Sequence, residues 1–152
     1  MLRSVADTSD MILFSCHGEF DPVNPLKSKL LLSKDDKNDG FLEAREIFGL
    51  DMSTYMIAMS ACETGLSAIR GGDEVIGLNR SFIFAGATSL LSSLWKVDDL
   101  ATAVMIKRFF RNLRRQDINR AEALRQAQII VRTEINSHPA FWASFYLTGD
   151  FR

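Results

Sequence analysis

Four short runs of apolar or small residues stand out along the chain and predict buried β-strands. Their apolar character is nearly continuous rather than alternating, which is typical of strands covered on both faces. The runs are Met11–Cys16, Tyr55–Ala61, Thr88–Trp95 and Ala143–Thr148.

Helical patterns separate these predicted strands. Leu42–Phe48 is expected to form one short helix, and Asp73–Ala85 a longer one. In the longer segment, one helical face collects the apolar side chains of Val75, Leu78, Phe82 and Ala85.

Two further helices have recognisable starts. Asp98 has the position of an N-cap, and the helix after it carries an apolar stripe made of Leu100, Ala103, Ile106, Phe110 and Leu113. Asn119, followed three residues later by Glu122, has the form of a capping box that opens a helix to about Asn136.

The alternation of strands and helices predicts an α/β fold with a parallel, doubly wound sheet and helices on both faces. Only one long segment, Gly18–Gly40, lacks such a pattern. It holds two prolines and a run of charges, so we expect a surface loop, which can include a small hairpin.

Composition and charge narrow the class of protein. A chain of 152 residues has about the size of one domain, and 18 Lys and Arg against 19 Asp and Glu argue against binding to nucleic acid or to an acidic membrane surface. The sequence shows neither a signal-peptide pattern nor the ~20 apolar residues of a membrane-spanning helix. Its two cysteines are too few for a disulfide framework. We therefore expect one cytoplasmic domain with free thiols.

The residues that leave the predicted strands carry the candidate chemistry, because ligands of open α/β sheets bind beyond the carboxyl ends of the strands. His17 and Cys62 lie 45 residues apart, each just past a strand, so neighbouring strands would bring imidazole and thiol together. A nearby histidine favours the nucleophilic thiolate. The backbone N–H groups of Gly18 and Cys62 would then form an oxyanion hole.

These residues resemble the caspase-like (clan CD) cysteine peptidases, and within them the CHAT domain family. The resemblance starts with His17-Gly18 after one apolar strand and Ser60-Ala61-Cys62-Glu63-Thr64-Gly65 after the next. It extends over most of the chain through Gly18–Pro22, Ala44–Phe48, Gly71–Glu74, Ser93–Asp99, Ala121–Ala127 and Leu147–Asp150.

The resemblance implies a three-layer α/β/α fold with a mostly parallel sheet, and a thiol protease with a catalytic dyad. His17 would be the base or proton shuttle and Cys62 the nucleophile. In separases, which are related, an acidic residue of the corresponding Leu-Trp segment helps to bind an arginine at P1. Asp98 and Asp99, with Trp95, would therefore line a substrate pocket for a basic P1 residue.

Several of these residues also have simpler interpretations. N-capping explains Asp98 fully, and Trp95 is equally suited to core packing. Cys16 is expected in the core, because strand alternation turns it away from the side of His17. The basic residues Lys107, Arg108, Arg111, Arg114 and Arg115 are interpreted as a solvated helix face.

Other kinds of site are not supported by the sequence. Cys16, His17, Cys62 and His138 lack recognised zinc-ligand spacing. Neither a P-loop nor a Gly-x-Ser-x-Gly elbow is present in the sequence. No cofactor and no metal are implied.

The start of the chain departs from the family pattern. Caspase-like domains of this kind carry a further strand-helix-strand unit before the His-Gly strand, and only sixteen residues precede His17. The chain is therefore expected to be the C-terminal part of a longer CHAT domain, with Met11–Cys16 as an exposed edge strand. Expected partners are a protein or peptide substrate, tetratricopeptide-repeat regions, and another chain that completes the sheet, including a homo-oligomer. The alternative function is a non-catalytic interaction module that keeps the fold.

Overall fold

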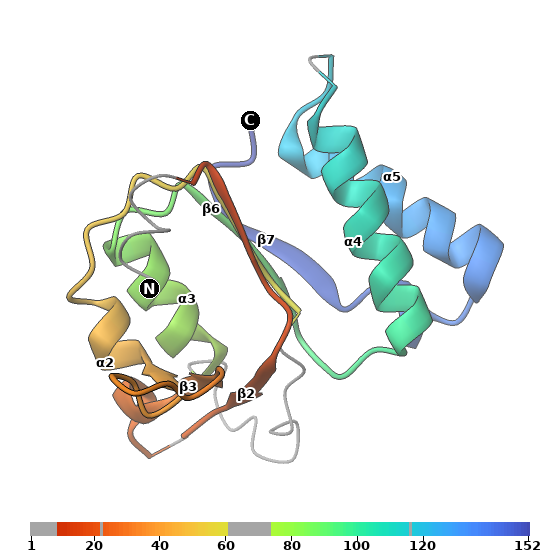
Figure 1. The fold of residues 1–152 in the computed structure, drawn as a ribbon. Coiled ribbons are helices and arrows are strands. Elements are labelled where there is room, and N and C mark those ends of the chain that lie inside the picture. The colour runs from red at the N-terminus through yellow and green to blue at the C-terminus, as the bar shows by residue number, and fades with distance from the viewer. Residues whose placement is uncertain (1–8, 22, 61–73, 116) are drawn as a thin grey trace.

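A four-stranded sheet forms the centre of the protein in the computed structural model, which describes residues 9–21, 23–60, 74–115 and 117–152. Its strands are β1 (Met11–Phe14), β5 (Met56–Met59), β6 (Ser89–Ser93) and β7 (Phe145–Gly149), in the spatial order β1-β5-β6-β7. β1, β5 and β6 run parallel, and β7 runs antiparallel to β6 (Figure 1). The expected sheet is confirmed as mostly parallel.

The two central strands are covered on both faces. Every residue of β5 and of β6 is buried, as their nearly continuous apolar sequences predict. β1 differs because it lies at an edge of the sheet, where exposed and buried residues alternate along it. The register pairs Ile12 with Ile57 and Ala58 with Leu91.

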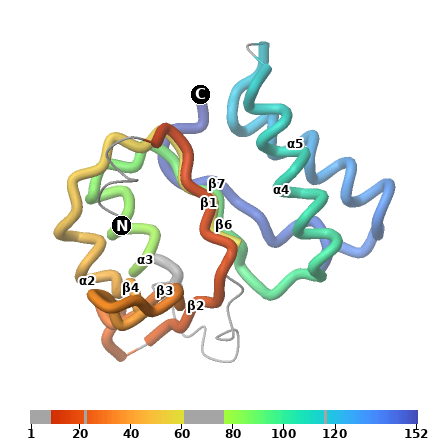
Figure 2. The backbone as a smooth tube through the Cα atoms, viewed as in Figure 1, coloured from red at the N-terminus to blue at the C-terminus, as the bar shows by residue number. Residues whose placement is uncertain are grey.

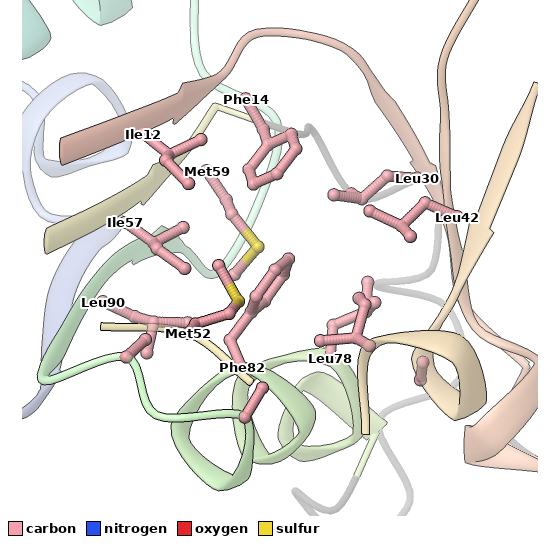
Figure 3. Packing of buried hydrophobic residues seen from close by; sticks show 14 residues of the cluster. Ile12, Phe14, Leu30, Leu42, Met52, Ile57, Met59, Leu78, Phe82 and Leu90 are labelled. Carbon is pink, nitrogen blue, oxygen red and sulfur yellow. The ribbon is translucent and has the colours of Figure 1, made fainter. Parts of the chain in front are cut away.

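One face of the sheet packs against α2 (Ala44–Ile47) and α3 (Glu74–Phe84). Figure 3 shows this core, in which Phe14 of β1 and Phe82 of α3 lie with their ring centroids 5.5 Å apart. Leu78, Phe82 and Ala85 are buried, so the expected apolar face of this helix is confirmed for these residues.

The opposite face packs against α4 (Asp99–Leu113) and α5 (Arg120–Ile130), which lie side by side (Figure 1). A π-helical turn, η3 (Val131–Ile135), continues α5, and α6 (Pro139–Trp142) precedes β7. No helix of the described segments is long and apolar enough to cross a membrane.

Both predicted N-caps are present. An Oδ1 atom of Asp98 accepts from the backbone N–H of Ala101 at 3.0 Å, and that of Asn119 from Glu122 at 2.8 Å. The side chain of Glu122 pairs with Arg125 and Gln126, its neighbours on the helix surface. A complete capping box, with both reciprocal hydrogen bonds, is formed at the start of α2 by Glu43, its N-cap, and Glu46.

The apolar stripe predicted for α4 is only partly confirmed, because Ile106, Phe110 and Leu113 pack against the core but Leu100 and Ala103 do not. Ala101, Met105 and Phe109 are the buried residues, whereas Leu100 is 61% exposed and Ala103 is exposed. α4 is apolar over a wide arc, so the sequence periodicity fits more than one face. The contact with the sheet and with α5 decides which face is buried.

The segment expected to be a loop instead forms a second sheet. β2 (His17–Glu19), β3 (Lys29–Leu31) and β4 (Phe41–Glu43) pair antiparallel in the order β2-β3-β4, with the 3₁₀ turn η1 (Pro25–Lys27) between β2 and β3 (Figure 2). Leu30, in the middle strand, is fully buried. These strands are three residues long, too short for a clear alternating pattern, so the prolines and charges around them dominate the sequence signal.

Candidate functional site

A cavity of about 550 Å³ lies where β1 and β5 end, beside the first half of α4. Its position agrees with the general rule that sites of open α/β sheets form beyond the carboxyl ends of the strands. The lining residues are Leu13, Ser15, Cys16, His17, Ser60, Asp99, Thr102, Ala103, Ile106 and Lys107.

His17 reaches this cavity because the chain passes directly from β1 into the small sheet. It is the first residue of β2, is exposed, and pairs with Leu31 of β3. Gly18 follows as a buried residue opposite Leu30. Pairing with β3 fixes the backbone of His17 and Gly18, and of these two residues His17 lines the cavity.

The end of β5 lies directly beside the end of β1. The backbone N–H of Ser60 donates to the carbonyl oxygen of Phe14 at 2.8 Å, and Ser60 lines the same cavity as His17. Cys62, the predicted nucleophile, lies outside the described residues. The structure therefore brings together His17 and the strand that leads to Cys62.

The two acidic residues predicted for the substrate pocket have different positions. The carboxylate of Asp98 accepts the capping hydrogen bond from Ala101, and Asp98 does not line the cavity. Asp99 lines the cavity together with His17. Of the pair, only Asp99 belongs to the lining of the cavity.

Trp95 lies apart from this cavity. It is half-buried, packs against the core beneath α4 and α5, and donates its indole N–H to the carbonyl oxygen of Ala140 at 2.9 Å. Trp95 therefore has the core-packing position that was the simpler of its two interpretations.

Cys16 contacts both the hydrophobic core and the cavity. Its side chain is half-buried against the core between β1 and α3, and it also lines the cavity beside His17. Burial raises the pKa of the Cys16 thiol above its ordinary value, because a thiolate there would lose solvation. This environment favours the neutral thiol of Cys16 over the nucleophilic thiolate.

Sequence reasoning missed the contribution of α4 to the cavity. Thr102, Ala103, Ile106 and Lys107 follow Asp99 at helical spacings of three, four, seven and eight residues. This spacing was the available signal, since a helix that presents Asp99 to a site presents these residues on the same side.

The described residues contain no group of His, Cys, Asp and Glu side chains that could hold a metal ion. His138 is instead an N-cap: its Nδ1 accepts from the backbone N–H of Ala140 at 3.2 Å at the start of α6.

The mostly parallel sheet between two helical layers, with His17 at its carboxyl edge, defines a caspase-like α/β fold. More narrowly, the chain belongs to the CHAT domain family, whose sequence profile matches residues 1–150. This family is related to the caspase-like peptidases.

Two curated proteins show similarity to the chain. Tetratricopeptide repeat protein 28 of Homo sapiens is 30% identical over 129 residues, which cover 76% of this chain and 5% of the human protein. The protein of the same name from Mus musculus is 28% identical over 109 residues, covering 71% of this chain and 4% of the mouse protein. The chain thus spans about one-twentieth of these relatives or less.

Proposed function

We propose that this chain is a cysteine endopeptidase in which His17 activates Cys62. The observation that carries the proposal is the shared cavity of His17 and Ser60. Ser60 precedes Cys62 by two residues, and two trans peptide units span at most about 7 Å. Chain connectivity over two residues therefore supports the proposal that Cys62 acts at the cavity that His17 lines.

The reaction needs only these two side chains and backbone donors. His17 takes the thiol proton of Cys62, and the thiolate attacks the carbonyl carbon of the scissile peptide bond. The N–H groups of Gly18 and Cys62 stabilise the oxyanion. His17 then gives its proton to the leaving amine as the C–N bond breaks, and water hydrolyses the resulting thioester.

Asp99 supports a preference for a basic residue at P1. Its carboxylate shares the cavity with His17, and a lysine or arginine side chain would form a charge-assisted contact with it. Lys107 lines the same cavity two helical turns further along α4, about 12 Å away by helix geometry. The negative charge therefore dominates at the N-terminal end of α4. We assign Asp98 to capping and Trp95 to packing.

The partner and the location of the domain are also proposals. Both relatives are named after tetratricopeptide repeats, and such repeats are the partner region that we propose for this domain in a longer protein. Two cysteines are too few for a disulfide framework, which suits a reducing compartment, so we propose the cytoplasm.

Thiol reactivity tests the dyad before any substrate is known. The rates of iodoacetamide labelling of Cys62 and Cys16 are measured by mass spectrometry between pH 5 and 9, in the wild type and in His17→Ala. We expect Cys62 to label faster than Cys16 at low pH, and to slow down when His17 is lost. An equal labelling rate of Cys62 in the wild type and in His17→Ala would refute the dyad.

A peptide library then tests the preference at P1. The matched pair Asp99→Asn and Asp98→Asn separates the pocket from the cap, because both variants remove one carboxylate from adjacent positions. Loss of cleavage after arginine and lysine in Asp99→Asn alone is the expected result. Equal losses in both variants would reject the role of Asp99.

The alternative is a non-catalytic interaction module. The position of β1 at the edge of the described sheet favours it, because no described strand pairs with its outer side and such an edge can pair with a strand of another protein. If the protein is folded and iodoacetamide labels Cys62 no faster than Cys16, the result would favour the interaction module over the peptidase.

A further inference from the structure

Another cavity, of about 660 Å³, lies at the end of the molecule away from His17. It is bounded by the end of α4, the start of α5 and the residue that precedes β5. In Figure 1 the end of α4 and the start of α5 lie at the top, and β2, which begins with His17, lies at the bottom. The described lining residues are Tyr55, Leu113, Arg114, Arg115, Asp117, Ile118, Asn119 and Arg152.

Positive charge prevails in this cavity. Of its described lining residues, three are arginines and one, Asp117, is acidic. The carboxylate of Asp117 accepts from Nε and Nη2 of Arg115 at 3.0 Å and 2.7 Å. Arg152 pairs with Asp150 at 3.1 Å. Arg114 is exposed and forms no ion pair within the described segments, so an anionic group can bind to it without breaking one.

Tyr55 adds a planar wall to the same cavity. The guanidinium carbon of Arg120 lies 3.8 Å from the centroid of its ring and covers one face. The side chain of Arg120 is only 3% exposed and is held by Asp150 at 3.6 Å. Tyr55 nevertheless remains 43% exposed and lines the cavity. The ring is therefore fixed from behind before any ligand binds, which reduces the entropy lost when a second planar group stacks on it.

Apolar and polar groups complete the lining. Leu113, the last residue of α4, and Ile118 are half-buried against the core and also border the cavity. Asn119 caps α5 through its Oδ1, which accepts from the backbone N–H of Glu122. The side-chain N–H groups of Asn119 have no acceptor among the described residues. The cavity thus combines a ring, apolar edges, free amide donors and a cation.

We propose that this cavity binds a nucleotide. The base stacks on Tyr55 beside Leu113 and Ile118, and the phosphate groups contact Arg114. Aromatic side chains stack with any base, and a guanidinium group binds phosphate oxygens through paired N–H donors. The volume of about 660 Å³ lies within the usual range of small-molecule sites. The sequence contains no P-loop, so side chains rather than a glycine-rich loop hold the phosphates.

A nucleotide uses more of this cavity than a simpler anion does. Inorganic phosphate or an acidic side chain would meet Arg114 but carries no planar ring for Tyr55 to stack with. The site is also separate from the proposed peptidase site. Tyr55 precedes β5, whereas Ser60 follows it and lines the cavity of His17. The inference therefore holds whether or not the chain is a peptidase.

Isothermal titration calorimetry of the whole chain with ATP, adenosine and inorganic triphosphate tests the proposal in magnesium-free buffer. ATP should bind at least about tenfold more tightly than either of its parts, because only the whole nucleotide uses both the ring and the cation. Absence of ATP binding up to millimolar concentrations overturns the proposal. Triphosphate that binds as tightly as ATP also overturns it, since the base then contributes nothing.

Arg114→Gln and Arg111→Gln form a matched pair of variants. Both arginines are exposed on α4 or at its end and form no ion pair within the described segments, but only Arg114 lines the cavity. Arg114→Gln should raise the Kd for ATP by at least about tenfold, and Arg111→Gln by less than about twofold. Equal losses in both variants would mean unspecific attraction by basic residues and would overturn the site.

The ring is tested by Tyr55→Phe, which keeps it, and Tyr55→Leu, which removes it. Tyr55→Phe should bind ATP within about twofold of the wild type, and Tyr55→Leu at least about fivefold more weakly. Circular dichroism reports whether each variant folds.

NMR of the wild type adds a test that needs no variant. ATP should shift the backbone amide signals of Leu113, Arg114 and Asn119, which border the cavity. Shifts confined to other parts of the chain, or ATP binding that Tyr55→Leu leaves unchanged in a folded protein, overturn the proposal.

Discussion

The guanidinium carbon of Arg120 lies 3.8 Å from the centroid of the Tyr55 ring. The side chain of Arg120 is only 3% exposed, and its Nη1 lies 3.6 Å from a carboxylate oxygen of Asp150 and donates to the carbonyl oxygen of Arg152. One residue at the start of α5 thus joins the approach to β5 with the C-terminal segment after β7.

Arg120→Ala should therefore lower the free energy of unfolding by about 2 kcal/mol, through loss of the cation–π contact and of the charged hydrogen bond. Urea denaturation measures it. Arg120→Lys keeps the charge but not the planar donor group, so its free energy of unfolding should lie between those of the wild type and Arg120→Ala. An alanine variant as stable as the wild type would contradict this account.

A buried polar group links α3 to the two strands β6 and β7. The side-chain amide of Asn79 donates to the hydroxyl of Tyr146 at 2.7 Å and accepts from the hydroxyl of Ser92 at 3.0 Å. Asn79→Ala should cost about 2 kcal/mol of stability, since Ser92 loses its acceptor in a buried position. Tyr146→Phe removes only one of the bonds and should cost less in the same denaturation experiment.

Two adjacent carboxylates at the start of α4 should differ in their effect on stability. Asp98→Ala removes the hydrogen bond to Ala101 and should cost about 1 kcal/mol. Asp99→Ala removes no hydrogen bond among the described residues. It removes only a negative charge from the first helical turn, so its loss of stability should be smaller. A thermal melt of each variant compares them, and equal losses would argue against Asp98 as the principal cap.

Gly86 is required by the backbone at the turn between α3 and β6. Its φ is +109°, and a Cβ added there would lie 2.0 Å from the carbonyl oxygen of Met52. Gly86→Ala should therefore destabilise the protein by about 2 kcal/mol or more. Gly49→Ala is the control, because its Cβ would meet only an ordinary contact of 3.5 Å.

The raised pKa of Cys16 predicts a specific pH dependence of its labelling. Burial favours the neutral thiol, so at neutral pH Cys16 holds less thiolate than a free cysteine does. In a Cys62→Ser variant, iodoacetamide should label Cys16 slowly at pH 7 and faster only as the pH rises through the raised pKa. In urea the thiol is solvated, and labelling at pH 7 should accelerate. A Cys16 that reacts equally fast in the native and unfolded protein would disprove this environment.

Local sequence signals predicted the central elements well. β5 and β6 are continuous apolar runs, because both of their faces are buried, and periodicity alone is enough to find them. The caps at Asp98 and Asn119 were equally visible, since capping depends on a side chain and the next three residues. His17 was predicted at the carboxyl edge of the sheet, where the structure places it.

Features that depend on distant parts of the chain were not visible in this way. β2, β3 and β4 are short and find their partners across loops, so their pairing left no periodic signal. The buried face of α4 is chosen by its contact with the sheet and α5.

The sequence by itself determined the order of the four central strands, the starts of α4 and α5 and the family, because these rest on neighbouring residues and on motifs. Only the tertiary structure decided that Asp99 rather than Asp98 shares a cavity with His17, and that Met11 and Leu13 remain exposed at a sheet edge. Such proximities arise when segments that are far apart in sequence pack together to remove apolar surface from water.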